Sequence, residues 1–335
     1  MIDNCIFICI IRFSLIFCFS SRHQFQMKMN EVTVSSPATV ANVVCGFDIL
    51  GFALAEPCDT FTVRKTSRKG VTIINKDNFN LPTEPEKNVS GAALLALLKE
   101  VKEDIGFEII SQKIIKPGSG IGSSAASAAG VVVAANHLLD NRFSQEQLVE
   151  FAMCGELIAS GAKHADNIAP CIYGGVTLIR SLHPLDIIPI PAPPLFVTVI
   201  HPQIEVKTSE ARQILKRNVP LKDAITQWAN VAGLISGLMK SDYDLIARSL
   251  EDVIVEPVRS ILIPAFAEMK IQCKEAGALG GGISGSGPSV FMLSKDLSTA
   301  QKVETVMKDI YSKVGVEFHT HVTTISREGV QVKSI

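Results

Sequence analysis

A run of small residues in the first half of the chain has the composition of an anion-binding loop. Residues 117–126 read Pro-Gly-Ser-Gly-Ile-Gly-Ser-Ser-Ala-Ala, and an alanine- and valine-rich helix is predicted over residues 125–139. The glycines expose backbone N–H groups, and a helix start adds free amides and the positive end of its dipole. Together these groups suit a polyphosphate. The alternative is a turn that only caps the helix, and the loop by itself does not decide between the two.

The glycine spacing in this loop excludes two common nucleotide-binding motifs. Positions 118, 120 and 122 do not give the G-x-G-x-x-G pattern, and no Gly-Lys-Ser/Thr follows as in a P-loop. Neither a dinucleotide-binding fold nor a P-loop enzyme is therefore supported. Ser123 and Ser124 end the loop, where a hydroxyl can cap the helix or hold Mg²⁺.

A carboxylate stands beside an apolar helix face further along the chain. A helix is predicted over residues 144–160, with Ser144 and Gln147 spaced as a capping box. The buried stripe is expected at Leu148, Phe151, Ala152, Gly155 and Ala159. Glu156 continues this row, and Mg²⁺ is commonly bound by one or two carboxylates together with substrate phosphates. The helix pattern alone favours a solvated position for Glu156, at the rim of the apolar stripe.

Three hydrogen-bonding side chains follow in one short stretch. His164, Asp166 and Asn167 precede the apolar residues 168–170. They could line a pocket, although Asp-Asn pairs are also common in plain turns.

The elements that must position these residues are a mixture of strands and helices. Strands are expected over residues 31–35, 49–54, 60–65, 71–74, 107–115, 176–180, 195–201, 289–293 and 317–325. Further helices are expected over residues 90–101, 208–217, 221–239, 242–250, 264–276 and 298–314. Residues 36–46 are expected to form a polar loop, 184–194 a proline-rich linker, and Trp228 part of the core. Several strands are adjacent in sequence, which indicates an α+β protein and not a doubly wound parallel sheet.

Composition limits the classes of partner and the cellular compartment that we expect for the chain. It has 335 residues and a formal net charge of −1, so no nucleic acid or acidic membrane is expected as a partner. Its eight cysteines are scattered, which fits reduced thiols in the cytoplasm.

The first 28 residues differ from the rest and are expected to lie outside the fold. The apolar run from Cys5 to Phe19 is broken by Arg12, and the acidic Asp3 stands before it where a signal peptide has basic residues. We expect the true start at Met27 or Met29. A membrane anchor or targeting peptide is the alternative.

Three stretches together resemble the signature motifs of the GHMP kinases. They lie at residues 37–42 with 46–48 and Gly51, at residues 118–126, and at residues 281–289. Each is weak alone, but their order and separation are specific. Within the family, residues 164–170, 174–175, 208–212 and 256–259 are similar to the members that phosphorylate L-homoserine. Cys45 departs from the usual proline.

The resemblance implies a fold of two halves. Residues 29–190 would resemble domain 2 of ribosomal protein S5, with a left-handed βαβ crossover. Residues 195–335 would be ferredoxin-like. The resemblance also implies ATP and Mg²⁺ as cofactors, and it is compatible with a homodimer.

The resemblance also implies a role for each motif residue in nucleotide binding. Ser124 and Glu156 would hold Mg²⁺, and Asn88 and Val89 would lie against the adenine. The residues that would wrap the phosphates or close over them are Pro117, Gly118, Ser119, Gly120, Ile121, Gly122, Ser123, Ser124, Ala125, Ala126, Ser284, Gly285 and Gly287.

The remaining motif residues would form the amino-acid site. Arg212 and Arg259 would grip the α-carboxylate, because a guanidinium matches a carboxylate through two parallel hydrogen bonds. The other residues of this site would be Asn42, Asp48, His164 and Asp166. Thr208 would lie near the transferring group. Asn167 occupies the position of the aspartate base of some relatives, so no strong base is expected, and Asp48 or a water would take the proton.

Three other functions compete with this interpretation. One is a GHMP kinase for mevalonate or a sugar, although a sugar offers nothing for two carboxylate-binding arginines. Another is a non-catalytic binding protein of the same fold, which the intact Ser124 and Glu156 disfavour. The third is a nucleic-acid module, which the absence of a basic patch disfavours.

Overall fold

The computed structural model describes residues 30–206 and 208–334. The leader over residues 1–28 lies outside the described residues. In the described part of the chain, no helix combines the length and apolar character needed to cross a membrane.

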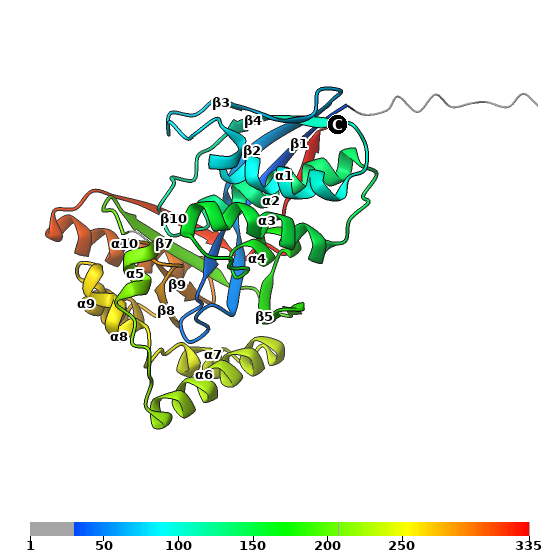
Figure 1. Ribbon diagram of the computed structural model, residues 1–335. Coiled ribbons are helices and arrows are strands. Elements are labelled where there is room, and N and C mark those ends of the chain that lie inside the picture. The colour runs from blue at the N-terminus through cyan, green and yellow to red at the C-terminus, as the bar shows by residue number, and fades with distance from the viewer. Residues whose placement is uncertain (1–29, 207, 335) are drawn as a thin grey trace, which may run out of the picture.

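A seven-stranded sheet combines strands of the first half of the chain with β11, the last strand of the second half (Figure 1). Its strands are β1 (Glu31–Ala41), β2 (Leu50–Thr66), β3 (Gly70–Asn75), β4 (Gly106–Gln112), β5 (Val176–Leu182), β6 (Leu185–Ile190) and β11 (Gln331–Ser334). The order is β11-β1-β2-β4-β3, with β5 pairing with β2 and β6 with β5. Only β3 and β4 are parallel, and helix α1 (Val89–Glu100) joins them.

Two expectations for this sheet were wrong. The polar loop over residues 36–46 is largely strand, because β1 continues to Ala41 and its small polar side chains are satisfied inside the protein. Ser36 Oγ, for example, donates to the carbonyl of Ala126 at 2.7 Å. The linker over residues 184–194 contains β6, an edge strand in which prolines are tolerated.

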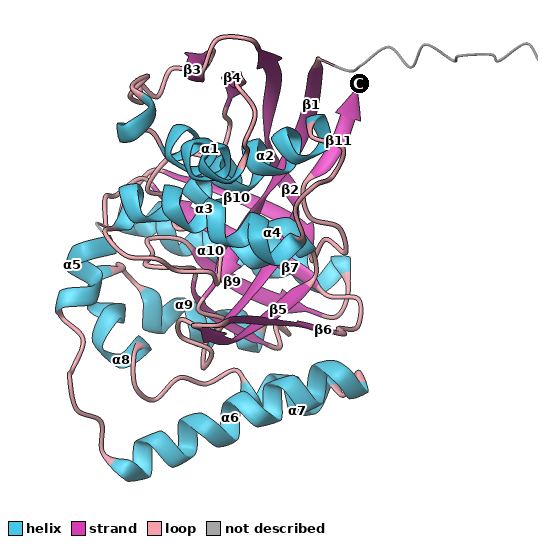
Figure 2. Cartoon of the chain, turned by 45° about the vertical axis from the view of Figure 1, so that its right-hand side comes forward, coloured by secondary structure: helices cyan, strands magenta, loops and turns pink. Residues whose placement is uncertain are grey.

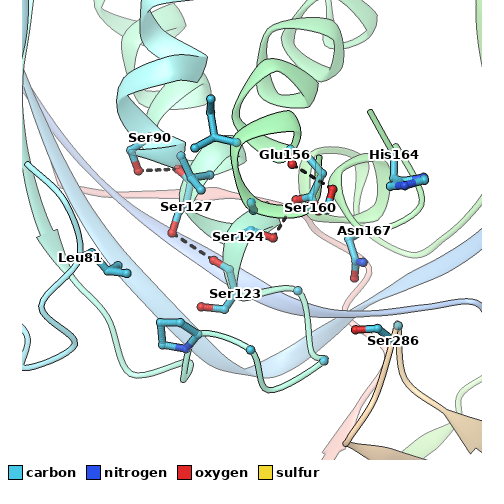
Figure 3. Close-up of a pocket in the computed structure, with 18 of the residues that line it drawn as sticks. Leu81, Ser90, Ser123, Ser124, Ser127, Glu156, Ser160, His164, Asn167 and Ser286 are labelled. Atoms are coloured by element: carbon cyan, nitrogen blue, oxygen red, sulfur yellow. Dashed lines mark hydrogen bonds between the residues drawn. The ribbon is translucent and has the colours of Figure 1, made fainter. Parts of the chain in front are cut away.

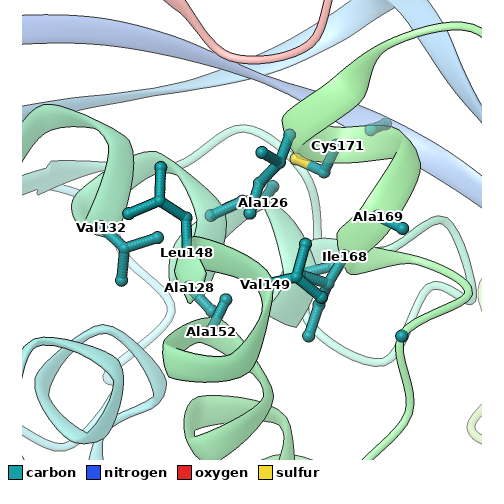
Figure 4. Close-up of a cluster of buried hydrophobic side chains, with 14 of the residues drawn as sticks. Ala126, Ala128, Val132, Leu148, Val149, Ala152, Ile168, Ala169 and Cys171 are labelled. Carbon is teal, nitrogen blue, oxygen red and sulfur yellow. The ribbon is translucent and has the colours of Figure 1, made fainter. Parts of the chain in front are cut away.

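Three more helices stack on this sheet: α2 (Ser123–Leu138), α3 (Gln145–Ser160) and α4 (Ile168–Tyr173). Figure 4 shows their contact, where Ala126, Ala128 and Ala152 let larger neighbours such as Leu148 approach closely. The capping box of α3 is confirmed, since Gln147 N donates to Ser144 Oγ and Ser144 N to Gln147 Oε1.

The second half contains a four-stranded antiparallel sheet. Its strands are β7 (Phe196–Pro202), β8 (Gly280–Ile283), β9 (Val290–Ser294) and β10 (Phe318–Thr324). Their order is β10-β7-β9-β8, with α9 (Phe266–Glu275) and α10 (Leu297–Val314) in the connections. This is the β-α-β-β-α-β arrangement of ferredoxin-like domains, which confirms the expected α+β fold class.

Four helices lie between β7 and α9. They are α5 (Thr208–Gln213), α6 (Leu221–Lys240), α7 (Tyr243–Ser249) and α8 (Glu256–Arg259). A short 3₁₀ turn, Ser260–Leu262, follows α8, and another, Pro85–Lys87, precedes α1 in the first half of the chain. Figure 2 shows α6 and α7 along the lower edge of the molecule. The expected burial of Trp228 was wrong, because this α6 side chain is 63% exposed while Leu234 and Leu238 face the core.

Candidate active site

A cavity of about 360 Å³ collects most of the residues singled out in the sequence. It lies beside the start of α2, and both halves of the chain contribute to it. The predicted residues that line it are Asn42, Asp48, Asn88, Val89, Pro117, Gly118, Gly120, Gly122, Ser123, Ser124, Glu156, His164, Asp166, Asn167, Arg212, Arg259 and Gly285. The predicted residues that do not line it are Ser119, Ile121, Ala125, Ala126, Ser284 and Gly287. Thr208 begins α5, and its side chain falls outside the described part of the chain.

The glycine loop is held in a conformation that needs its glycines. Gly118, Gly120 and Gly122 have φ values of 75°, 82° and 70°, which other residues rarely adopt. Gly122 is also the N-cap of α2. The loop therefore runs directly into the free amides of the helix, as an anion site requires.

The third motif supports this loop from behind. Ser284 Oγ donates to the carbonyl of Gly120 at 2.7 Å, and Ser289 Oγ donates to the carbonyl of Ser119 at 2.6 Å. Ser284 and Ser289 are fully buried. The side chain of Ser284 thus holds the loop in place without facing the cavity.

A buried ion pair that sequence reasoning missed lies beneath the loop. Lys113 Nζ binds Asp59, and it also donates to Ser127 Oγ at 2.7 Å and to the carbonyl of Ser123 at 3.0 Å. Asp59 accepts hydrogen bonds from two successive backbone amides that follow β4. The pair connects β2, β4 and the first turn of α2. In sequence these residues stand on separate elements, so no local pattern marks them.

Ser124 and Glu156 meet at the cavity wall (Figure 3). Ser124 Oγ donates to Glu156 Oε2 at 2.7 Å. Glu156 is half-buried, and this burial raises its pKa, so the solvated rim position favoured from the helix alone was wrong. Ala159, expected in the buried stripe, is exposed at the cavity edge. A half-buried carboxyl beside a hydroxyl is a donor set that suits a hard cation.

The opposite end of the cavity carries the charged side chains. Arg212 Nη2 donates to both oxygens of Asp48, at 2.7 and 2.9 Å. Asn42 holds Asp48 in turn, because Asn42 Oδ1 accepts from the Asp48 amide at 2.8 Å. Arg212 Nε is buried and has no hydrogen-bond partner among the described residues. One donor of this guanidinium is therefore unsatisfied in this arrangement.

Phe47 brings the two arginines together, a role that sequence reasoning missed. The guanidinium carbons of Arg259 and Arg212 lie 4.8 and 5.4 Å from the centre of its ring. Arg259 is buried, and its Nε donates to the carbonyl of Ala211 at 3.0 Å. Burial, followed by the nearby charge of Arg212, lowers the pKa of Arg259. Two guanidinium groups beside one ring make this end of the cavity suited to a carboxylate.

The polar cluster after α3 also lines the cavity, and Figure 3 shows His164 and Asn167 there. Burial raises the pKa of Asp166 to about 7, with further contributions from Asp48 and Glu156. Burial lowers the pKa of His164. Asn167 Oδ1 accepts from Thr39 Oγ1 at 2.8 Å, so its amide is fixed in orientation.

The remaining part of the cavity is more apolar. Ile73, Leu81, Pro82 and Val89 line it. Asn88 has a structural role there, because its side chain caps α1 by accepting from the amides of Ser90 and Gly91. The cavity thus has an apolar end, a glycine loop at the start of α2 and a charged end.

Comparison with known proteins agrees with this geometry. The family model "GHMP kinases N terminal domain" matches residues 88–175, and "GHMP kinases C terminal" matches residues 234–313. The homoserine kinase of Chloroherpeton thalassium is 45% identical, over 91% of this chain and 100% of the relative. That of Methanococcus maripaludis is 39% identical, over 86% of this chain and 97% of the relative.

Solved structures extend the comparison to three dimensions. The crystal structure of homoserine kinase from Cytophaga hutchinsonii matches with a TM-score of 0.88 and 45% identity, covering 92% of this chain and 99% of that one. A mevalonate kinase from L. major matches with a TM-score of 0.66 at 15% identity, covering 90% of this chain and 97% of that one, which shows a shared fold. The chain therefore belongs to the homoserine kinases of the GHMP kinase family.

Proposed function

We propose that the chain transfers the γ-phosphoryl group of ATP to the side-chain hydroxyl of L-homoserine, a step of threonine biosynthesis. The observation that carries this proposal is the charged end of the cavity. Arg212 and Arg259 converge there on Phe47, and Arg212 keeps a buried Nε without a partner. Two guanidiniums suit the α-carboxylate, and Asp48 offers a carboxylate for the ammonium group.

The apolar end and the glycine loop suit ATP. We place the adenine among Ile73, Leu81 and Val89, and the phosphates on the loop before α2. From that position the γ-phosphate would face the charged end. Positioning and neutralisation of charge supply most of the catalysis in phosphoryl transfer.

Ser124 and Glu156 fit Mg²⁺ and would hold it. Burial raises the pKa of Glu156, and a bound cation would stabilise its charged form. When bound, Mg²⁺ supplies neutralisation of phosphate charge.

The hydroxyl proton has no dedicated acceptor among the predicted catalytic residues. Asn167 is a neutral amide whose Oδ1 is already engaged by Thr39, so it serves to orient. Asp48 is paired with Arg212. We infer that the substrate carboxylate draws Arg212 away and frees Asp48 for the ammonium group or the hydroxyl. Otherwise a water takes the proton.

A cytoplasmic location is part of the proposal. The five cysteines in the described part of the chain are free thiols, which fits a reducing compartment. A homodimer, for which the family resemblance leaves room, is also part of the proposal.

Turnover tests the proposal directly. The full chain would be given ATP and Mg²⁺ with L-homoserine, L-serine, L-threonine, mevalonate or galactose, and release of ADP would be followed. We expect turnover selective for L-homoserine, with kcat/KM falling at least roughly a hundredfold in Arg259→Leu. Turnover on mevalonate or galactose would retain the fold but contradict the amino-acid site. ATP binding without turnover on any compound would indicate a binding protein.

A further inference from the structure

A buried histidine outside the three motifs contributes to the support of the glycine loop. Ser289 Oγ donates to the carbonyl of Ser119 at 2.6 Å. His201, near the end of β7, contacts the same hydroxyl, with its Nδ1 3.3 Å from Ser289 Oγ. All three residues are at most 5% exposed. A series of buried polar groups therefore leads from β7 in the second half to the loop in the first half.

The direction of the Ser119 carbonyl decides which way the loop presents the next amide. In a planar trans peptide, the C=O of one residue and the N–H of the next point in opposite directions. Ser289 holds the Ser119 carbonyl on the buried side, so the Gly120 amide points to the other side. Gly120 lines the cavity, whereas Ser119 does not. A reversed peptide would therefore turn a carbonyl oxygen toward a phosphate, in place of an N–H donor.

The hydroxyl of Ser289 carries one hydrogen, and two acceptors could compete for it. That hydrogen can go to the carbonyl of Ser119 or to an unprotonated Nδ1 of His201. The distance to the Ser119 carbonyl is the shorter of the two, which assigns the hydrogen to that bond. His201 Nδ1 must then carry a hydrogen of its own and donate it to Ser289 Oγ. The donors therefore run from His201 through Ser289 to Ser119.

The surroundings of His201 keep its ring neutral, so only one of its nitrogens carries a hydrogen. Burial lowers the pKa of His201 to about 4, and the nearby charge of Lys116 acts in the same direction. Nε2 is buried and has no hydrogen-bond partner among the described residues, so no acceptor there favours a hydrogen on that nitrogen. A hydrogen on Nε2 would turn Nδ1 into an acceptor, which would draw the Ser289 hydrogen away from Ser119.

The end of β7 holds the loop at a second point as well. Gln203 Nε2 donates to the His201 carbonyl at 3.1 Å, and Gln203 Oε1 accepts from Lys116 Nζ at 2.7 Å. Lys116 directly precedes the loop, and its carbonyl accepts from the Ser119 amide at 3.2 Å. The first turn of the loop is therefore connected to β7 through Lys116 as well as through Ser119.

We propose that His201 is a positioning residue for nucleotide binding, which donates from Nδ1 to Ser289 and so keeps the Ser119 carbonyl turned away from the phosphates. His201 itself does not line the cavity. The inference rests on the proposed function, because it takes the glycine loop as the site of the ATP phosphates. The alternative is a buried histidine that only fills space between the two halves.

Titration of the full chain with ATP and Mg²⁺ tests the effect on binding. His201→Leu removes the donor, so we expect the dissociation constant for ATP to rise roughly fivefold, the usual contribution of one hydrogen bond. KM for L-homoserine should stay nearly constant. His201→Asn places an N–H close to the position of Nδ1 and should restore most of the affinity, whereas His201→Gln places it near Nε2 and should not.

A neighbouring histidine provides the matched control for these variants. His319 pairs with His201 on the adjacent strand but is exposed, so His319→Leu should leave the affinity for ATP unchanged. Thermal melting of each variant checks that it is folded. Equal affinities in His201→Asn and His201→Gln would mean that the side chain only fills space, and would overturn the proposal.

A double-mutant cycle tests whether His201 acts through Ser289. Ser289→Ala removes the hydroxyl between the two groups, so His201→Leu should have almost no further effect on ATP affinity in that background. Independent losses from the two changes would contradict action through Ser289. An unmodified chain that binds no ATP would overturn the proposed function together with this inference. A chain that binds ATP equally well with His201→Leu would overturn this inference alone.

Nitrogen NMR of the histidine rings tests the position of the hydrogen without any ligand. Comparison with His201→Asn identifies the His201 signals, because they are absent from the spectrum of that variant. We expect a neutral ring at pH 7 with its hydrogen on Nδ1. A hydrogen on Nε2 would overturn the proposal, even if the variants of His201 bind ATP more weakly.

Discussion

At the scale of single residues, the properties of the cavity depend on how its side chains are held as well as on which side chains are present. Ser124, Glu156, Arg212 and Arg259 could be named from the sequence through their motifs, and they line one cavity. Phe47 could not be assigned a role in this way. Its contacts with two arginines come from distant parts of the chain, and an aromatic residue in a motif gives no sign of what lies over its ring.

Phe47 provides the first prediction. Phe47→Leu removes the ring that attracts both guanidiniums, so we expect KM for L-homoserine to rise roughly tenfold. KM for ATP should stay nearly constant, and Phe47→Tyr, which keeps the ring, should behave like the unmodified chain. Steady-state kinetics with each substrate in turn measures this. Equal increases in both KM values would indicate general disruption and contradict a positioning role.

Asp166 provides a prediction about pH. Its pKa is raised to about 7 from an ordinary value of 3.8, so the folded protein holds a proton that the unfolded chain releases between these values. The free energy of unfolding should therefore fall as pH rises from about 4 to about 7, by roughly 4 kcal/mol at most from this group.

Asp166→Asn removes this dependence. Relative to the unmodified chain, the variant should gain stability as pH rises through that range and keep the gain above it. Urea denaturation at several pH values measures the difference. A difference that does not change with pH would show that the pKa of Asp166 is ordinary.

At the scale of elements, local signals were sufficient where they were strong. The capping box and apolar spacing predicted α3 to within a residue, and the glycine loop predicted the start of α2. The errors came where tertiary contacts override local composition. Small polar residues of β1 find partners on α2, and proline-rich β6 is stabilised by pairing with β5.

The glycine loop provides the prediction at this scale. Gly122→Ala would place a methyl group against Thr39 Oγ1, whereas the same change at Gly118 meets nothing within 4 Å. Both positions have positive φ, so both variants carry a backbone strain of about 1 kcal/mol. Gly122→Ala should therefore raise KM for ATP at least roughly tenfold more than Gly118→Ala. Nucleotide titration of the two variants measures this. Equal effects would mean that strain alone matters.

At the scale of the whole molecule, the two-sheet architecture could be expected only through family resemblance. Strand β11, at the end of the chain, pairs with β1 at its beginning, and β10 pairs with β7. Such pairings join residues far apart in sequence, so the local hydrophobic periodicity of the sequence does not predict them. The cavity also depends on contacts between distant parts of the chain. Asn42 Nδ2 from the first half, for example, donates to the carbonyl of Gly285 from the second.

The most direct measurement of the central claim compares L-homoserine with 3-aminopropan-1-ol, which is the same molecule without its carboxylate. We expect the unmodified chain to prefer L-homoserine by roughly a thousandfold in kcat/KM, because a site built to bind a charged group discriminates strongly against its absence. Arg259→Leu should lose most of this preference while still binding ATP. A preference that Arg259→Leu leaves unchanged would contradict recognition of the carboxylate by the two arginines on Phe47.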